Sequence, residues 1–182
     1  MKVLEERDVA HTGTKTATFR ADDIKNSVEF RKAYEHAPNV VSAEDQPFEN
    51  SPDGLIKHLV HEKLGTREQC VDAYMLFLKE GGRSGKHRHM WEEVIFVAEG
   101  SGYDLHWDVK FDCIDTYHWE WEAEPRKSEW TRGDFIYVPP FSIHQHFNAT
   151  ADGEARLIVI SNRIVKAMGF DWLDQLEHAP GF

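Results

Sequence analysis

From residue 55 onward the sequence is a series of short apolar runs separated by turn-forming residues. The runs are rich in Val, Ile, Leu, Phe and Tyr, and β-branched and aromatic residues favour strands. Several short strands at regular spacing are typical of a sandwich or a barrel, so the sequence predicts an all-β fold. The runs are LIKHLVHEKL, VDAYMLFLKE, WEEVIFVAEG, DFIYVPP and ARLIVIS.

The flanking segments predict short helices. Residues 22–36 begin with an Asp that can cap a helix, carry acids early and bases late, and stop before Pro38. The tail predicts two more helices, because Gly169 can end one and Asp171 can cap the next. The expected organisation is one domain in three parts: an N-terminal arm and helix at 1–54, a barrel at 55–162 and C-terminal helices at 163–182.

Length and charge set limits on partners. A chain of 182 residues can bury a sizeable core. Its net charge of −11 argues against a nucleic acid partner and against binding to an anionic membrane. No stretch approaches 18 consecutive apolar residues, and the first residues lack an apolar signal core. Cys70 and Cys113 form no close metal-binding or redox pair, so we expect a cytoplasmic setting.

Two imidazoles and a carboxylate follow one another with strand-like spacing at His87, His89 and Glu93. Because side chains alternate across a strand, all three are expected on one face, which continues into the apolar Ile95 and Val97. Such polar groups are costly inside a barrel unless they are paired or bind a metal. Imidazoles and a carboxylate suit a divalent Fe, Mn, Ni, Zn or Cu ion.

A second segment, GDFIYVPPFSIHQHFN at 133–148, can complete this set. The run FIYV predicts a buried strand, which Pro139 then interrupts. His144, His146 and Asn148 share one face after it, and a fourth ligand from this face would give three histidines and one glutamate.

These two segments resemble the two motifs of the cupin family. The resemblance implies a small double-stranded β-helix, or jelly-roll, barrel whose metal is held by His87, His89, Glu93 and His144. One residue departs from the family pattern, because Phe141 stands where a glycine is usual. The first motif is Gly81, five residues, His87, one residue, His89, three residues, Glu93, six residues, Gly100; the second is Gly133, five residues, Pro139, then His144, three residues, Asn148.

Other residues are candidates for acid–base roles. His146 should share the face of His144, either as a donor and acid–base group or as a packed histidine. Tyr137 and Tyr74 lie in predicted strands, where a phenol could transfer a proton or could simply find a hydrogen-bond partner. The pair His58 and His61 is expected at the surface.

The charged residues beside the first motif can be interpreted in two ways. Arg83, Lys86 and Arg88 could anchor a substrate carboxylate, but solvated loop charges are favoured. Asn148 is expected to tighten its turn and not to bind metal.

The segment 103–113 alternates strictly, with apolar side chains at the odd positions. A second alternating run at 117–122 predicts a hairpin with it. The region 103–130 contains seven Tyr, Trp or Phe residues. We expect them to pack in the core and between subunits of a homodimer, or to form one wall of a ligand cavity.

The resemblance leaves several functions open, because the cupin fold hosts many chemistries. We expect an Fe(II) dioxygenase that takes O₂ and a small chelating anionic or aromatic substrate. The alternatives are a metal-dependent lyase or isomerase, with Tyr74, Tyr103 or Tyr137 as a base, and a non-catalytic small-molecule-binding protein. His146 and Tyr137 are the candidate catalytic residues.

Overall fold

The computed structural model describes residues 16–67, 70–112 and 118–182. The chain divides into two compact units between Ala37 and Pro38. In the first unit, helix α2 spans Phe19–His36 and buries none of its residues. It begins earlier than expected, with Thr18 at the N-cap, and Asp22 lies inside it, where its carboxylate accepts a hydrogen bond from the Thr18 hydroxyl.

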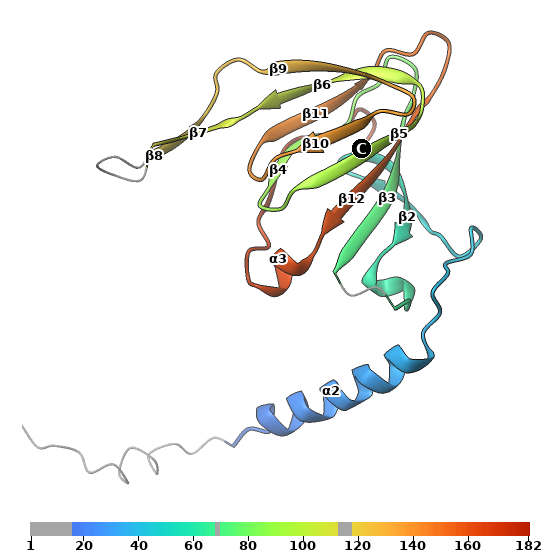
Figure 1. The fold of residues 1–182 in the computed structure, drawn as a ribbon, viewed down its shortest axis with the longest axis vertical. Helices are drawn as coiled ribbons and strands as arrows, with labels where there is room; N and C mark the ends of the chain where they lie inside the picture. The colour runs from blue at the N-terminus through green and yellow to red at the C-terminus, as the bar shows by residue number, and fades with distance from the viewer. Residues whose placement is uncertain (1–15, 68–69, 113–117) are drawn as a thin grey trace, which may run out of the picture. The chain divides into compact units, whose positions relative to one another are not determined.

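The second unit consists of two facing antiparallel sheets and a separate two-stranded hairpin (Figure 1). A six-stranded sheet, called sheet A, contains in spatial order β1 Phe48–Ser51, β2 Gly54–Val60, β3 Val71–Leu78, β12 Ala155–Asn162, β5 Glu93–Glu99 and β10 Phe135–Val138. A five-stranded sheet, called sheet B, contains β13 Leu173–Glu177, β4 Lys86–His89, β11 Ile143–Asn148, β6 Ser101–Trp107 and β9 Arg126–Thr131. The hairpin pairs β7 Val109–Asp112 with β8 His118–Trp121. Two short helical turns complete the unit, η1 Glu62–Leu64 and α3 Ile164–Ala167.

Each strand run seen in the sequence contains a strand, although the first run ends in the turn η1, and two further features of this region differ from expectation. The strand β1 lies within the region expected to be an N-terminal arm. The first metal-motif segment is not one strand: β4 and β5 belong to different sheets and are joined by a turn.

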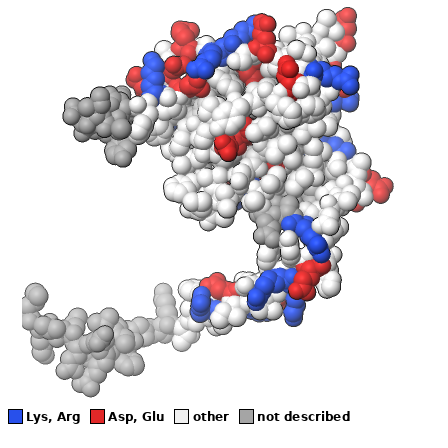
Figure 2. Space-filling model, viewed as in Figure 1, with Lys and Arg blue, Asp and Glu red and all other residues white. Residues whose placement is uncertain are grey.

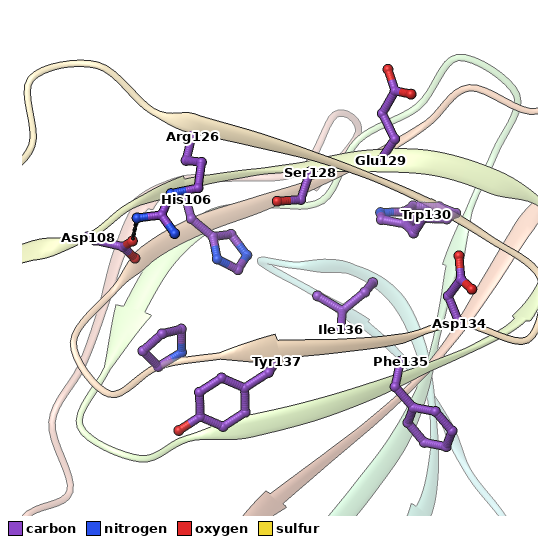
Figure 3. A pocket seen from close by; sticks show the side chains of 11 residues that line it. His106, Asp108, Arg126, Ser128, Glu129, Trp130, Asp134, Phe135, Ile136 and Tyr137 are labelled. Atoms are coloured by element: carbon purple, nitrogen blue, oxygen red, sulfur yellow. Dashed lines mark ion pairs between the residues drawn. The ribbon is translucent and has the colours of Figure 1, made fainter.

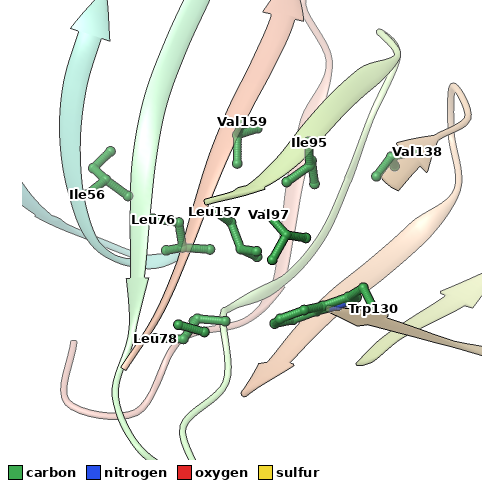
Figure 4. Close-up of a cluster of buried hydrophobic side chains, with 10 residues drawn as sticks. Ile56, Leu76, Leu78, Ile95, Val97, Trp130, Val138, Leu157 and Val159 are labelled. Carbon is green, nitrogen blue, oxygen red and sulfur yellow. The ribbon is translucent and has the colours of Figure 1, made fainter. Parts of the chain in front are cut away.

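The inner face of sheet A changes from apolar to polar along its strands. The register places Leu157 beside both Leu76 and Val97, and all three are fully buried in the core (Figure 4). Further along the same strands, Ser161 lies opposite both Asp72 and Glu93. The core therefore fills one end of the space between the sheets and leaves polar side chains at the other.

The expected second C-terminal helix is wrong. Residues Leu173–Glu177 form the strand β13, which pairs with β4 along the edge of sheet B. Arg88 on β4 makes hydrogen bonds of 2.8 and 2.6 Å to Asp174 on β13. Backbone pairing and this ion pair hold the segment extended, and the first helix, α3, ends just before Gly169, whose φ is +85°.

The strand expected over 103–113 divides at Asp108 into β6 and β7. The apolar odd positions were expected in the interior, but the buried positions of β6 are even ones. In β6 the even positions Gly102 and Asp104 are buried, while Tyr103 lies on the other face, stacked on Phe147 at 4.7 Å. Burial of Asp104 is tolerated because its carboxylate has partners, described below. The strands β7 and β8 form the expected hairpin, and Cys113 and Tyr117 lie outside the described residues.

The position where Phe141 replaces a glycine keeps the glycine-like backbone. Phe141 has φ of +64°, in the left-handed region that disfavours side chains with a Cβ. Its ring lies 5.3 Å from that of Trp119 and 5.8 Å from that of Trp172. The aromatic contacts offset the backbone cost, so the turn that leads into β11 is preserved.

Candidate metal centre

The four residues predicted to bind a metal converge between the two sheets. His87 and His89 come from β4, Glu93 from the start of β5 and His144 from β11. His144 lies directly opposite His87 in the sheet B register. One ligand atom from each of the four lies within 4.8 Å of the others. All four side chains are at least 95% buried.

The polar atoms at this centre match what a metal ion would satisfy. Nε2 of His89, Nε2 of His144 and Oε2 of Glu93 are buried and have no hydrogen-bond partner among the described residues. Buried polar atoms are costly without partners, and three that point at one another are a reason to expect an ion between them. The donor set of imidazoles and one carboxylate suits a divalent transition metal.

The other ring nitrogens orient these histidines. Nδ1 of His89 lies 2.7 Å from the Trp91 carbonyl oxygen, and Nδ1 of His144 lies 3.0 Å from that of Ser142. A carbonyl only accepts, so each Nδ1 carries the proton and each Nε2 presents a lone pair, as in metal-binding histidines. His87 Nδ1 lies 2.9 Å from Asp53 Oδ1 but makes no aligned hydrogen bond to it, so the carboxylate acts on this ring by charge and proximity.

Electrostatics favour the ligand forms of His144 and Glu93. Burial lowers the pKa of His144 well below its usual value, and the neighbouring histidines lower it further. Burial would raise the pKa of Glu93, but attraction to His89 and His87 outweighs it and the pKa is lowered. At neutral pH the centre therefore has a neutral imidazole at His144 and a carboxylate at Glu93, the forms that bind metals.

A cavity of about 200 Å³ opens beside the centre, against His87, His89 and Glu93. His58 and His61, which were expected at the surface, are half-buried and also line it. A bulge between His58 and Val60 breaks the alternation, and the two imidazole rings lie 5.4 Å apart. The complete lining is Asp53, Ile56, His58, Val60, His61, Asp72, Ala73, Tyr74, His87, His89, Trp91, Glu93, Ser161 and Leu173.

Two aromatic residues shape this cavity. Trp91 stacks on the metal-ligand candidate His89, with ring centroids 4.6 Å apart and an interplanar angle of 2°. Tyr74 comes from β3, and burial, together with the charges of Glu93, Asp53 and Asp72, raises its pKa well above the usual value. The Tyr74 phenol is therefore a hydrogen-bond donor at neutral pH and a poor base.

Next to His144 in sheet B lies a buried polar network that was not predicted from the sequence. Asp104 is fully buried; its Oδ1 lies 2.9 Å from His146 Nδ1 and accepts a hydrogen bond of 2.7 Å from the Trp130 indole. Its Oδ2 lies 3.5 Å from His106 Nε2. Burial would raise the pKa of Asp104, but attraction to His146 and these contacts hold it well below its usual value. His146, a candidate catalytic residue, is thus tied to a carboxylate and lines none of the described cavities.

Replacing Asp104 by Asn should destabilise the fold by about 3 kcal/mol. The change removes the negative charge beside His146 and leaves that buried imidazole without its counter-charge. Urea unfolding at pH 7 measures this loss. Glu129→Gln is the control, since Glu129 makes an exposed ion pair with Lys127 whose removal should change the free energy of unfolding by less than about 1 kcal/mol. Equal effects of the two substitutions would contradict the role given to Asp104.

Tyr137, the other candidate catalytic residue, is not placed at the metal centre. It is 53% exposed, and its hydroxyl donates to Glu92 at 2.8 Å. The run FIYV is therefore not the fully buried strand expected from the sequence: Phe135 and Tyr137 point outward and Ile136 points inward (Figure 3).

A second cavity, of about 440 Å³, lies between β9 and β10, the edge strands of the two sheets. Figure 3 shows the side chains that line it. The ring of His106 points into it and lies 6.1 Å from the ring of His144. Arg126 and Asp108 at its rim form an ion pair of 2.7 Å. His106 therefore stands between this side cavity and the metal centre.

The charged residues beside the first motif bind the C-terminal strand. Arg83 and Lys86 lie 3.1 and 3.8 Å from Glu177, and Arg88 pairs with Asp174. They are neither simple solvated charges nor open anchors for a substrate carboxylate. Asn148, as expected, ties a turn: its amide nitrogen lies 2.9 Å from the carbonyl oxygens of Leu78, Lys79 and Gly153.

Comparison with known proteins identifies the fold. No family model and no curated protein matches the sequence. A variant of Bacillus subtilis oxalate decarboxylase is 16% identical with a TM-score of 0.54, over 78% of this chain and 34% of that chain. CapF, solved with the inhibitor 3-isopropenyl-tropolone, is 16% identical with a TM-score of 0.51, over 72% of this chain and 34% of that one. An RmlC-like cupin from Shewanella frigidimarina is 17% identical with a TM-score of 0.49, over 70% of this chain and 92% of that one.

The two facing sheets and the buried cluster of three histidines and one glutamate define a jelly-roll protein with a candidate site for a divalent metal. Over the matched part, the fold is that of the oxalate decarboxylase and CapF structures. This chain spans about a third of the length of the oxalate decarboxylase and CapF chains, and at these identities the likeness concerns the fold and not the activity. Among the described helices, none is long and apolar enough to cross a membrane.

Proposed function

We propose that the protein is a mononuclear metal-dependent oxygenase, an Fe(II) dioxygenase acting on a small chelating anionic or aromatic substrate. The observation that carries the proposal is the convergence of four ligand atoms from His87, His89, Glu93 and His144 beside an accessible cavity. Four protein ligands on a six-coordinate ion keep positions for a chelating substrate and for O₂. Bound iron would supply the redox chemistry that no side chain here supplies.

The side chains around the centre have distinct roles in this proposal. Glu93 is the only anion among the four, so with a divalent ion the site keeps a net positive charge, which attracts an anionic substrate. The Tyr74 phenol, protonated at neutral pH, can donate a hydrogen bond to it. Trp91 supplies an apolar surface beside His89, suited to a flat substrate.

His61 is a further candidate for substrate contact. Its Nδ1 accepts a hydrogen bond of 3.0 Å from the Lys63 backbone, so the neutral ring carries its proton on Nε2. His58 Nε2 lies 2.6 Å from Glu49. The cavity thus contains two imidazoles that are not metal-ligand candidates and that can exchange hydrogen bonds with a substrate.

The same pair supports a second candidate function, a metal-dependent lyase or isomerase. In that reaction a base removes a proton from carbon while the metal stabilises the resulting anion. Tyr74 is unsuited as the base, and Tyr103 and Tyr137 lie outside the cavity, so His58 or His61 would take the proton.

Oxygen uptake distinguishes the two functions. The protein is reconstituted with Fe(II) and tested against catechols, salicylates, 2-oxo acids and thiols, with anaerobic samples as controls. The proposal predicts that product forms only with O₂ and in proportion to O₂ consumed. Turnover that proceeds equally without O₂ would contradict the oxygenase and support the lyase or isomerase.

A further inference from the structure

The outer face of sheet A is apolar, as is the part of its inner face that packs in the core. Its inner face packs in the core, but its strands are continuous apolar runs, VIFVA, FIYV and LIVI, and do not alternate with polar residues. Continuous runs are typical of strands covered on both sides. Within the described chain, sheet B covers only the inner face.

The apolar side chains on the outer face form one continuous surface. In the register, Tyr137 lies opposite Val94, and Val94 lies opposite Ile160. In the next row, Phe135 lies opposite Phe96, and their rings are 5.0 Å apart. The surface, called the outer face, has as its most exposed apolar members Phe48, Leu55, Val71, Val94, Phe135, Tyr137 and Ile160, between 38% and 70% exposed.

Few charges interrupt this surface. In Figure 2 the area over β5, β10 and β12 is almost free of charged side chains, whereas Lys, Arg, Asp and Glu gather over β6 and β9. Arg156 on β12 is neutralised by Glu99 at 3.1 Å and Glu154 at 3.0 Å. Because the chain carries a net charge of −11, two copies repel each other least through an uncharged face.

The area is of the size that a dimer needs. A large apolar side chain has about 200 Å² of surface, so seven of them at these exposures offer roughly 600 Å². A standard interface buries about 800 Å² on each partner, including its polar rim. A contiguous patch of this size is at the upper end of what monomers expose, and such patches are often functional.

We infer that the outer face is the contact surface between two copies of this chain, packed face to face about a two-fold axis. A dimer contact was expected at residues 103–130, but most of the described aromatic rings there already pack against other parts of the same chain. Trp130 is in the core, and the indole of Trp121 donates to the Phe141 carbonyl at 2.9 Å while Arg88 lies over its ring. The inference does not depend on the proposed enzymatic function.

The test compares two exposed phenylalanines in the full-length protein. Light scattering should give the wild type a mass of twice 21.1 kDa. Phe135→Glu, on the outer face, should weaken dimerisation at least tenfold, and so should Ile160→Lys on the next strand but one. Phe111→Glu is the matched control: Phe111 is 60% exposed on the hairpin, against 70% for Phe135, and its variant should remain a dimer.

Circular dichroism spectra verify that each variant is folded. A wild type that is monomeric at tens of micromolar would overturn the inference, because the outer face would then have to be covered by something other than a second copy. Dissociation by Phe111→Glu, with Phe135→Glu and Ile160→Lys both still dimeric, would overturn it in favour of the hairpin.

Discussion

Replacing His144 by Ala is expected to reduce the metal content of the purified protein by more than tenfold. His144 is fully buried, and the other three residues of the cluster are themselves candidate ligands, so none of them can replace it. Substitutions that only disturb the partners of a metal ligand typically cost 10–100-fold in affinity, so removing a ligand should cost at least as much. Elemental analysis of protein purified and reconstituted in parallel with the wild type measures the effect. We expect the same outcome for His87→Ala and His89→Ala.

His36→Ala is the control, because His36 is an exposed histidine at the end of α2. Its metal content should equal that of the wild type. Thermal unfolding of the metal-free proteins verifies that the barrel is retained in every variant. Wild-type metal content in all three ligand variants would show that the metal is held elsewhere.

Replacing Glu93 by Gln should separate substrate binding from reaction with O₂. The change keeps the shape of the side chain but removes the only negative charge among the four ligands. A metal ion held by four neutral groups attracts anions more strongly and is harder to oxidise. We therefore expect the variant to keep part of its metal, to bind a chelating anion at least as well as the wild type, and to lose most of its O₂-dependent turnover.

Anaerobic binding and aerobic O₂ uptake should be measured on the same iron-reconstituted sample. Glu92→Gln is the matched control, since Glu92 is the neighbouring residue but is exposed and bonded to Tyr137. Its binding and turnover should be unchanged. If Glu93→Gln retains both properties at wild-type levels, Glu93 does not set the charge of the centre.

The cluster of four candidate ligands was predictable from the sequence because side chains alternate in two of the strands that form it. The two-residue alternation puts His87 beside His89 on one face of β4, and His144 beside His146 on one face of β11. Polar side chains that share a face with core residues need a partner, and that need points to a metal. The spacing shared with the cupin motifs then implied which four residues meet.

Alternation could not tell which face of β6 is inside. It groups Asp104 with His106 and Tyr103 with Leu105, and the apolar group is the obvious choice for the interior. The opposite choice is stable because Asp104 finds His146 and Trp130 across the sheet, and such distant partners leave no local pattern. The only local signal for Asp104 is that it is an acidic residue close in sequence to the first histidine motif, and that does not distinguish it from exposed acids.

Other misses have the same origin in long-range contacts. The strand β13 is short and forms because β4 offers an edge and Arg88 a charge, neither of which lies in the tail itself. His58 and His61 reach the cavity through a bulge, which shifts the alternation by one residue. The local sequence contains neither the edge nor the bulge.

The most direct test of the metal centre is a crystal structure of the Fe(II)-reconstituted protein with anomalous diffraction measured at the iron edge. The proposed metal centre predicts one strong anomalous peak per chain between β4, β5 and β11, bound by a ring nitrogen of His87, His89 and His144 and by a carboxylate oxygen of Glu93. A strong peak bound by other residues, or no peak at these four side chains in crystals grown with excess Fe(II), would contradict it.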